Sequence, residues 1–318
     1  MNIVLSRWII CSFILFLGRA DGQEAVDPDT GLAYGLLIPA TSTMQRAWEI
    51  PRNPLRDSAL KKSPDRSLVL YGYKVFTQTP KEARTFTGNS LSCSNCHLNA
   101  GQREKALPLA GVAGVYPEYN KRSGKDATLE DRIIECFNRG LDASRKKEKA
   151  GKDTASLVQT KQSKEVTGIA AYIRWLSGES QKGEKPPWRG QNVIPSGSLI
   201  PVGRLDTARG HALYADRCEA CHGDNGQGKF IGDKKAGPLW GKESWNDGAG
   251  ASRIYTLAGI IRYMMPYLDP GSLTDEEAQH ISAYINSKAR PVYPYKSLDY
   301  PGSPVPADAV YYPRDGKK

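Results

Sequence analysis

Apolar residues recur at helical spacing in two pairs of segments along this chain. One pair comprises residues 72–76 (GYKVF) and 171–175 (AYIRW), and the other comprises residues 210–214 (GHALY) and 283–286 (AYIN). Apolar positions three and four residues apart form one face of a helix. Because the second pair repeats the first in order and in residue type, the pattern predicts one helical unit that occurs twice.

Two short polar motifs indicate where further helices begin. Thr128 with Asp131, and Thr274 with Glu277, each place a hydroxyl three residues before a carboxylate. In such a capping box, each of the two side chains binds a backbone N–H group at the helix start. We therefore expect helices that begin directly after Thr128 and directly after Thr274.

Each predicted unit also contains the motif C-x-x-C-H between its two helices. The residues are Cys93, Cys96 and His97 in the first unit and Cys218, Cys221 and His222 in the second. This spacing is typical of covalent attachment of a c-type haem, in which both thiols bond to the vinyl groups and the His binds the iron. A redox dithiol or half of a zinc site is the alternative, and the following His, present twice, disfavours both. The sequence therefore predicts two covalently bound haem c groups in an all-α fold of two tandem cytochrome c domains.

Stretches without helical periodicity set the expected domain boundaries. Residues rich in Gly, Ser, Lys and Pro separate the two units as a linker, and Pro- and Tyr-rich segments flank them as extended N- and C-terminal arms. The expected divisions are 23–65 for the N-terminal arm, 66–178 for the first cytochrome c domain, 179–201 for the linker, 202–290 for the second cytochrome c domain and 291–318 for the C-terminal arm.

The first residues resemble a secretory signal peptide, expected over 1–22. Arg7 precedes an apolar run over residues 8–17, and small and charged residues follow it. The run is too short to span a bilayer comfortably. An uncleaved anchor is the alternative, and a lipoprotein site is disfavoured because Ile10 precedes Cys11 where a small residue is needed. Haem attachment and export together predict a periplasmic protein with no stable membrane anchor after cleavage.

Composition adds a constraint on partners. The 318 residues are 25 % charged and 39 % hydrophobic, as in ordinary globular proteins, with a formal net charge of +10. Nucleic acid is excluded as a partner in the periplasm. The positive charge indicates either solubility alone or attraction of small anions or an acidic redox partner, and the composition does not decide between them.

The iron of a His-bound haem needs a ligand on its other side. For the second unit the candidates are Met264 and Met265. Met265 is favoured because Pro266 ends the helix and leaves Met265 on an irregular segment that can turn inward. His211 and His280 are alternatives, as is a purely structural role for both Met residues. We expect His222/Met265 ligation, which raises the potential and suits electron transfer.

The first unit has neither Met nor His between His97 and its closing helix, but it has Cys136. This is the one Cys of the six that lies outside both the haem motifs and the signal segment. Arg132 and Arg139 lie four residues before it and three after it, so both guanidinium groups can approach its side of a helix. Cations lower the pKa of a thiol, whereas an inert core Cys has apolar neighbours. We predict that the Cys136 thiolate is the second iron ligand; a buried, inert Cys is the alternative.

The residues around the first haem motif resemble the thiosulfate dehydrogenase family of periplasmic dihaem cytochromes. The resemblance covers roughly residues 65–290. It is carried by residues 93–101 (CSNCHLNAG), 108–111 (PLAG), 116–119 (YPEY), 122–124 (RSG), 132–139 (RIIECFNR) and 171–177 (AYIRWLS), by the second haem motif and by Met265 with Pro266.

This resemblance implies that the first haem, with His/Cys ligation, hosts catalysis and that the second relays electrons. It implies oxidation of two thiosulfate ions to tetrathionate, sometimes in reverse, with electrons passed to an external acceptor such as a soluble cytochrome. By motif, Cys136 takes the ligand position and Arg122 an anion-contacting position. Joining two dianions requires fixed cations, for which Arg122, Arg132 and Arg139 are the candidates.

One loop departs from the family pattern. Residues 140–143 read GLDA, where the family usually has Ser-Met-Asn-Gly. We expect this loop to flank the pocket, where it lacks a hydroxyl and an amide. Two alternatives therefore stay open: a non-catalytic electron-transfer cytochrome or respiratory-complex subunit, and an oxidoreductase for another sulfur oxyanion.

Overall fold

The protein is represented by a computed structural model that describes residues 25–26, 33–34, 37–38, 50–145, 160–178, 180, 182–232 and 234–313. The expected signal peptide and most of the expected N-terminal arm lie outside the described residues. No helix among the described residues is long and apolar enough to cross a membrane.

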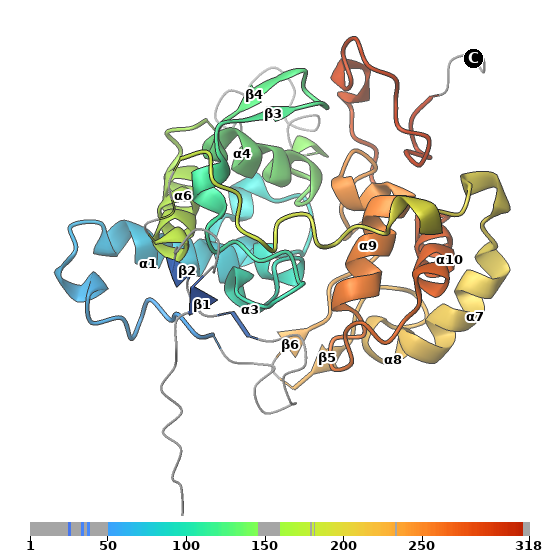
Figure 1. Ribbon diagram of the computed structural model, residues 1–318, viewed down its shortest axis with the longest axis horizontal. Coiled ribbons are helices and arrows are strands. Elements are labelled where there is room, and N and C mark those ends of the chain that lie inside the picture. The colour runs from blue at the N-terminus through green and yellow to red at the C-terminus, as the bar shows by residue number, and fades with distance from the viewer. Residues whose placement is uncertain are drawn as a thin grey trace, which may run out of the picture.

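Helices dominate the described part of the chain (Figure 1). The α-helices are α1 (Arg66–Thr77), α2 (Thr79–Glu82), α3 (Leu98–Gly101), α4 (Leu129–Arg139), α6 (Lys164–Ser177), α7 (Thr207–Arg217), α8 (Glu219–His222), α9 (Ile254–Met264) and α10 (Asp275–Asn286). Short 3-10 helices are η1 (Leu60–Lys62), η2 (Arg84–Phe86), η3 (Cys93–Asn95), η4 (Val112–Val115), η6 (Ser196–Ser198), η7 (Val202–Arg204), η8 (Gly250–Ser252) and η9 (Lys296–Leu298).

Among the described residues, the strands form three two-stranded antiparallel sheets. They pair β1 (Ala25–Val26) with β2 (Ala33–Tyr34), β3 (Glu118–Asn120) with β4 (Lys125–Ala127), and β5 (Phe230–Ile231) with β6 (Lys234–Lys235). The predicted helical class is therefore confirmed as mostly α, and the small hairpins are an addition that the sequence pattern did not predict.

In the first helical unit, α1 crosses α6 at two glycines. A Cβ atom on Gly72 would stand 1.8 Å from the backbone oxygen of Gly168, so only glycine permits this approach. Phe76, one helical turn after Gly72, is 2 % exposed and packs 5.5 Å from the ring of Tyr172. The repeated Gly-x-x-x-aromatic pattern thus marks a close helix crossing with an aromatic core beneath it.

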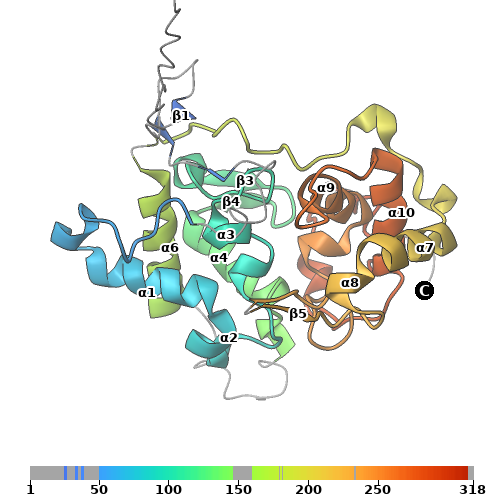
Figure 2. The ribbon, with the colours of Figure 1, turned by 90° about the horizontal axis from the view of Figure 1, so that it is seen from below.

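The second unit contains the same kind of close helix crossing at a glycine. A Cβ atom on Gly210 of α7 would stand 2.1 Å from the backbone oxygen of His280 on α10. Tyr214 follows one turn later, is 1 % exposed and packs 5.4 Å from Tyr284. Helix α9 packs along α10. The internal repeat in the sequence therefore corresponds to two helical units built on the same crossing, which lie side by side in Figure 2.

Both predicted capping boxes are confirmed. The Thr128 hydroxyl accepts the Asp131 N–H, and an Asp131 carboxylate oxygen accepts the Thr128 N–H at 3.0 Å. Thr274 and Glu277 form the same pair at the start of α10. These caps fix the first turns of α4 and α10 and hence the directions in which their side chains project.

Two segments without long helices connect the units. Residues 182–201 run from α6 to α7, and in them Trp188 donates to the Ala110 carbonyl and Asn192 to the Lys105 carbonyl. Residues 291–313 leave the second unit and contact the first, because the Tyr300 N–H donates to the Arg122 carbonyl at 2.7 Å. In Figure 1 this C-terminal segment is the red chain that rises beside β3, β4 and α4.

Candidate active site

The first C-x-x-C-H motif folds as a tight turn that directs its imidazole inward. Helix η3 begins at Cys93, and the Cys93 carbonyl accepts the N–H of His97 at 2.9 Å. The His97 Nδ1 atom lies 2.6 Å from the Leu107 carbonyl oxygen. A carbonyl at this distance holds the proton on Nδ1 and leaves Nε2 as the metal-binding nitrogen. The two thiols and the oriented imidazole therefore fit a covalently attached haem.

The loop between His97 and Leu107 has an unusual backbone. Asn99, Ala100, Lys105 and Leu107 all have positive φ values, between 52° and 57°. Non-glycine residues rarely adopt this region, and strained residues cluster at functional sites. The strain lies on the segment that delivers the hydrogen-bond acceptor to His97, so it supports the assignment of this loop to the haem site.

The second motif has the same arrangement. The His222 Nδ1 atom lies 3.0 Å from the Gly237 carbonyl oxygen, which again leaves Nε2 for a metal. The Tyr214 hydroxyl donates to the Gly223 carbonyl at 2.6 Å and anchors the turn to α7. Burial raises the pKa of Cys218 to about 12, because the thiol is enclosed by protein.

Cys136 faces the first motif. Its side chain is exposed by surface area, yet burial by the surrounding protein raises its pKa. A sulfur atom that lines the wall of a deep hollow is accessible to solvent and is also surrounded by protein atoms. Burial, and after it the Cys136 sulfur, raises the pKa values of Cys93 and Cys96, the latter to about 12. The Cys136 sulfur thus lies close enough to the two haem-attachment thiols to raise their pKa values.

Arg132 is the cation that reaches this sulfur. Its charge opposes the effect of burial on the pKa of Cys136 and, together with burial, lowers the pKa of His97. Arg132 also donates to Glu135 at 2.7 Å, and Glu135 accepts from the Asn120 amide at 2.9 Å. Glu135 and Asn120 were not predicted as site residues, although the i, i+3 spacing of Arg132 and Glu135 signals the ion pair.

Arg139 does not share this position. Its guanidinium forms an ion pair with Asp299 of the C-terminal segment and stacks 4.1 Å over the ring of Tyr293. Arg122 lies in the same region, where Nη1 of Arg122 and Nη1 of Arg139 donate to one acceptor, the Gly248 carbonyl, at 2.8 and 3.1 Å. The expectation that both Arg132 and Arg139 approach the sulfur therefore holds for Arg132, whereas Arg139 joins the two units.

The loop over residues 140–143 begins at the sulfur and then leaves it. A Cβ atom on Gly140 would stand 3.3 Å from the Cys136 Sγ atom. Leu141, Asp142 and Ala143 are buried, and Asp142 accepts from the Asn246 amide of the second unit at 3.0 Å. Within this loop, Gly140 therefore lies beside the candidate ligand, whereas Asp142 contacts the second unit.

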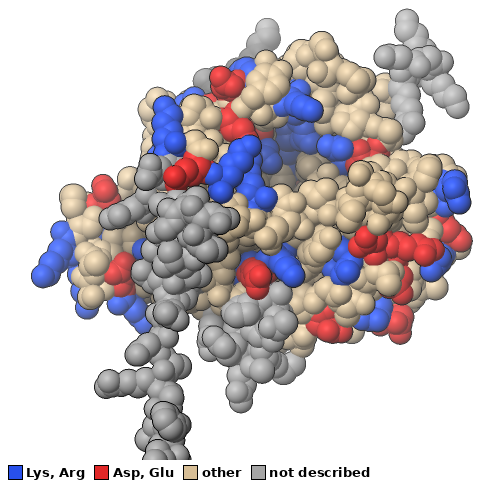
Figure 3. Space-filling view, in the orientation of Figure 1, with Lys and Arg blue, Asp and Glu red and all other residues tan. Residues whose placement is uncertain are grey.

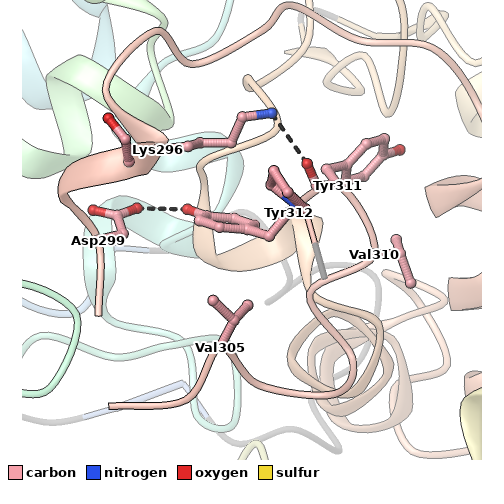
Figure 4. A pocket seen from close by; sticks show the side chains of 8 residues that line it. Lys296, Asp299, Val305, Val310, Tyr311 and Tyr312 are labelled. Atoms are coloured by element: carbon pink, nitrogen blue, oxygen red, sulfur yellow. Dashed lines mark hydrogen bonds between the residues drawn. The ribbon is translucent and has the colours of Figure 1, made fainter. Parts of the chain in front are cut away.

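Figure 3 shows Lys and Arg atoms gathered around a hollow between the first unit and the C-terminal segment. A separate pocket of about 550 Å³ lies within the C-terminal segment itself (Figure 4). Its polar groups are already paired, since Lys296 donates to the Tyr311 carbonyl and Tyr312 donates to Asp299. We therefore do not assign a ligand to it.

The candidate ligands of the second unit differ in their surroundings. Met264 is 2 % exposed and packs in an apolar cluster with Leu98 and Ala106 of the first unit. Met265 follows α9 with an extended backbone and is only partly buried. His280 accepts the Asp206 N–H at its Nδ1 atom, and His211 stacks 4.9 Å from Tyr284. The two His residues are thus engaged elsewhere, and of the two Met residues Met265 is the one on an irregular segment.

Comparison with known proteins assigns this chain to a family. A family model described as the SoxA/TsdA cytochrome c domain matches residues 83–181, and one described as cytochrome c oxidase, cbb3-type, subunit III matches residues 205–285. A thiosulfate dehydrogenase from Stutzerimonas stutzeri (strain A1501) is 36 % identical over 242 residues, which cover 76 % of this chain and 73 % of that protein. The chain belongs to the thiosulfate dehydrogenase family.

Other members support the same assignment. A thiosulfate dehydrogenase from Allochromatium vinosum is 33 % identical over 82 % of this chain and 91 % of its own length. The solved structure of thiosulfate dehydrogenase (TsdBA) from Marichromatium purpuratum superposes with a TM-score of 0.64 at 32 % identity over 73 % of this chain. The match spans 48 % of that solved chain. Membership of this family identifies the chain as an oxidoreductase, and its two cytochrome c domains indicate covalently bound haem c.

Proposed function

We propose that this protein is a periplasmic dihaem cytochrome that oxidises two thiosulfate ions to one tetrathionate and passes the two electrons to an external acceptor. Haem 1 is attached at Cys93 and Cys96, with His97 and Cys136 as iron ligands. Haem 2 is attached at Cys218 and Cys221, with His222 and Met265 as iron ligands. The observation that supports this most directly is the position of Cys136, with Arg132 beside it, facing the first haem motif.

The reaction needs positive charge at the site where the substrates meet. Two thiosulfate dianions join through their outer sulfur atoms, one S–S bond forms, and two electrons leave. Fixed guanidinium groups offset the repulsion between the dianions and are most effective where water is excluded. Arg132 takes this role because it lies beside Cys136, and Arg122 is the second candidate because of the family motif that it carries.

When bound, the haems supply one-electron acceptors whose potentials depend on their axial ligands. An anionic thiolate from Cys136 lowers the potential of haem 1, and a thioether from Met265 raises that of haem 2. The chain itself fixes the imidazoles through the Leu107 and Gly237 carbonyls. This ligand difference favours electron transfer from the first haem to the second.

A contact between the two units supports this direction of transfer. The segment after His97 contributes Leu98, Ala106 and Leu107 to one apolar cluster with Met264 and Met265. Each of these segments carries, or directly follows, a proposed iron ligand. The cluster therefore supports a short route from haem 1 to haem 2.

The test is direct oxidation of thiosulfate by the purified, haem-loaded protein. With ferricyanide as acceptor, we expect one tetrathionate for each two thiosulfate ions consumed and two ferricyanide ions reduced. If no tetrathionate forms between acidic and neutral pH although both haems are attached, the protein is a non-catalytic electron-transfer cytochrome. If the protein oxidises another sulfur oxyanion instead, it is an oxidoreductase with a different substrate.

A further inference from the structure

Tyr267 of the second unit is held by two side chains of the first unit. Arg103 donates a hydrogen bond to the Tyr267 hydroxyl, and this hydroxyl donates to the Asn99 amide oxygen at 3.3 Å. The Arg103 guanidinium also lies 4.3 Å from the centre of the Tyr267 ring, over its face. Tyr267 therefore contacts the first unit through its hydroxyl and through its ring.

The burial of Arg103 makes this contact strong. The Arg103 residue is 1 % exposed. A buried guanidinium depends on the groups packed directly against it, because water does not replace them. The loss of a hydrogen bond to a charged group typically changes an equilibrium constant by about ten-fold or more. The contact between Arg103 and Tyr267 is thus strong enough to influence the segment on which Tyr267 lies.

Both partners of Tyr267 belong to the loop that orients the imidazole of the first haem motif. Asn99 and Arg103 lie between His97 and Leu107, and the Leu107 carbonyl oxygen lies 2.6 Å from the His97 Nδ1 atom. Tyr267 is therefore attached to a part of the first unit whose position is set by its own haem site.

On the other side of Tyr267, the chain leads back to Met265 within two residues. The Met265 N–H donates to the Ile261 carbonyl at 3.1 Å, at the end of α9. Pro266 has a fixed φ and restricts the residue before it to an extended conformation, which Met265 adopts with φ −124° and ψ 152°. A connection this short and stiff leaves the Met265 backbone little freedom once Tyr267 is fixed.

We propose that Tyr267 is a positioning residue that uses its contacts with the first unit to keep Met265 at the iron of the second haem. This inference rests on the proposed His222/Met265 ligation. The ligation of the second haem then depends on the contact between the two units. A purely structural contact would stabilise the folded protein without changing how firmly Met265 binds the iron.

The experiment measures how easily imidazole displaces Met265 from the ferric second haem of the holoprotein. Imidazole binds this iron only while the Met is detached, so its apparent Kd falls as the detached fraction rises. The loss of the near-infrared sulfur-to-iron band follows the displacement. Tyr267→Phe removes the hydroxyl and keeps the ring, and we expect the apparent Kd for imidazole to fall about ten-fold.

Tyr255→Phe is the matched control. The Tyr255 hydroxyl donates to the Ile200 carbonyl at 2.7 Å, near the start of α9, which is the helix that leads to Met265. This variant therefore also loses a tyrosine hydrogen bond of the second unit, but at the far end of the helix. We expect its apparent Kd for imidazole to equal that of the parent.

Asn99→Gly tests the same contact from the first unit. Glycine tolerates the positive φ of 53° at this position and lacks the amide oxygen that accepts from Tyr267. We expect the apparent Kd for imidazole at the second haem to fall in this variant also. The fall should be smaller than in Tyr267→Phe, because the hydrogen bond from Arg103 remains.

The possible failures are distinguishable. An equal Kd for imidazole in Tyr267→Phe and Tyr255→Phe would show that Tyr267 makes only a structural contact. If Tyr267→Phe does not fold, an unchanged Kd in Asn99→Gly would contradict the inference. If the parent with both haems attached lacks the near-infrared band, the proposed His222/Met265 ligation is itself wrong, and the inference is wrong with it.

Discussion

Arg139 on α4 and Asp299 in the C-terminal segment form a two-point ion pair across 160 positions of the sequence, with Nη1–Oδ2 and Nη2–Oδ1 distances of 2.8 and 2.6 Å. Their side chains are 9 % and 4 % exposed. The Tyr312 hydroxyl donates to the same carboxylate. This pair fixes the C-terminal segment to the helix that carries Cys136.

Arg139→Gln should therefore act on stability and not on anion binding. Removing one partner leaves the Asp299 charge buried and unpaired, which costs about 3–5 kcal/mol. Urea unfolding of the holoprotein measures the loss, and Asp299→Asn in the same chain should recover part of it. A large rise in KM for thiosulfate at unchanged stability would instead place Arg139 in the active site.

We expect Glu135 to compete with thiosulfate for Arg132, with which it forms an ion pair. Because the Arg132 side chain is 55 % exposed, this pair contributes little to stability, about 0–1 kcal/mol. Glu135→Gln should release Arg132 and lower KM for thiosulfate about two- to five-fold, whereas Arg132→Leu should raise it about ten-fold or more. Glu130→Gln is the matched control, since Glu130 lies on the same helix as Glu135 and pairs instead with Arg174 of α6. High salt should reduce these differences, and equal KM values in both glutamine variants would contradict the role of Arg132.

Asp142 gives the contact between the units a pH dependence. It is fully buried, and burial raises its pKa from 3.8 to about 6, with the Asn246 amide opposing the rise. The folded state thus holds a proton that the unfolded chain releases, so the contribution of Asp142 to stability falls as pH rises from about 4 through about 6. Asp142→Asn should raise the free energy of unfolding at neutral pH by up to about 3 kcal/mol, and this gain should vanish near pH 4.

Urea unfolding of the holoprotein at several pH values checks this, with exposed Asp216→Asn as the control. A gain that does not depend on pH would mean that Asp142 is ionised throughout, held by the Arg145 guanidinium 2.8 Å away.

The two adjacent Met residues of the second unit should respond differently to truncation. Met265→Ala should abolish the near-infrared sulfur-to-iron band and lower the potential of haem 2. Met264→Ala should keep the band and lose about 2–5 kcal/mol of stability, because Met264 is 2 % exposed in the cluster between the units. Loss of the band in Met264→Ala alone would exchange the two assignments.

The sequence was most informative where neighbours along the chain decide the structure. The capping boxes at Thr128 and Thr274 are local, and the repeated segments that contain Gly72 and Gly210 predict equivalent helices in the two units. The close helix crossing at each glycine could not be predicted, because the facing backbone is remote in sequence. The direction of Arg139 could not be predicted, because helical spacing allows it to approach Cys136 and the choice is made by Asp299, which is remote in sequence. The burial of Asp142 depends likewise on Asn246 of the other unit.

The proposed mechanism depends most on Cys136 as the second iron ligand of haem 1. The electron paramagnetic resonance spectrum of oxidised Cys136→Ser tests this ligation most directly. Both haems stay attached in this variant, since the thiols of the two C-x-x-C-H motifs are untouched. We predict that the low-spin thiolate signal of haem 1 is replaced by a high-spin or water-bound signal, that the haem 2 signal is unchanged and that thiosulfate oxidation is lost. A spectrum identical to that of the parent would show that Cys136 does not bind the iron and would contradict the mechanism.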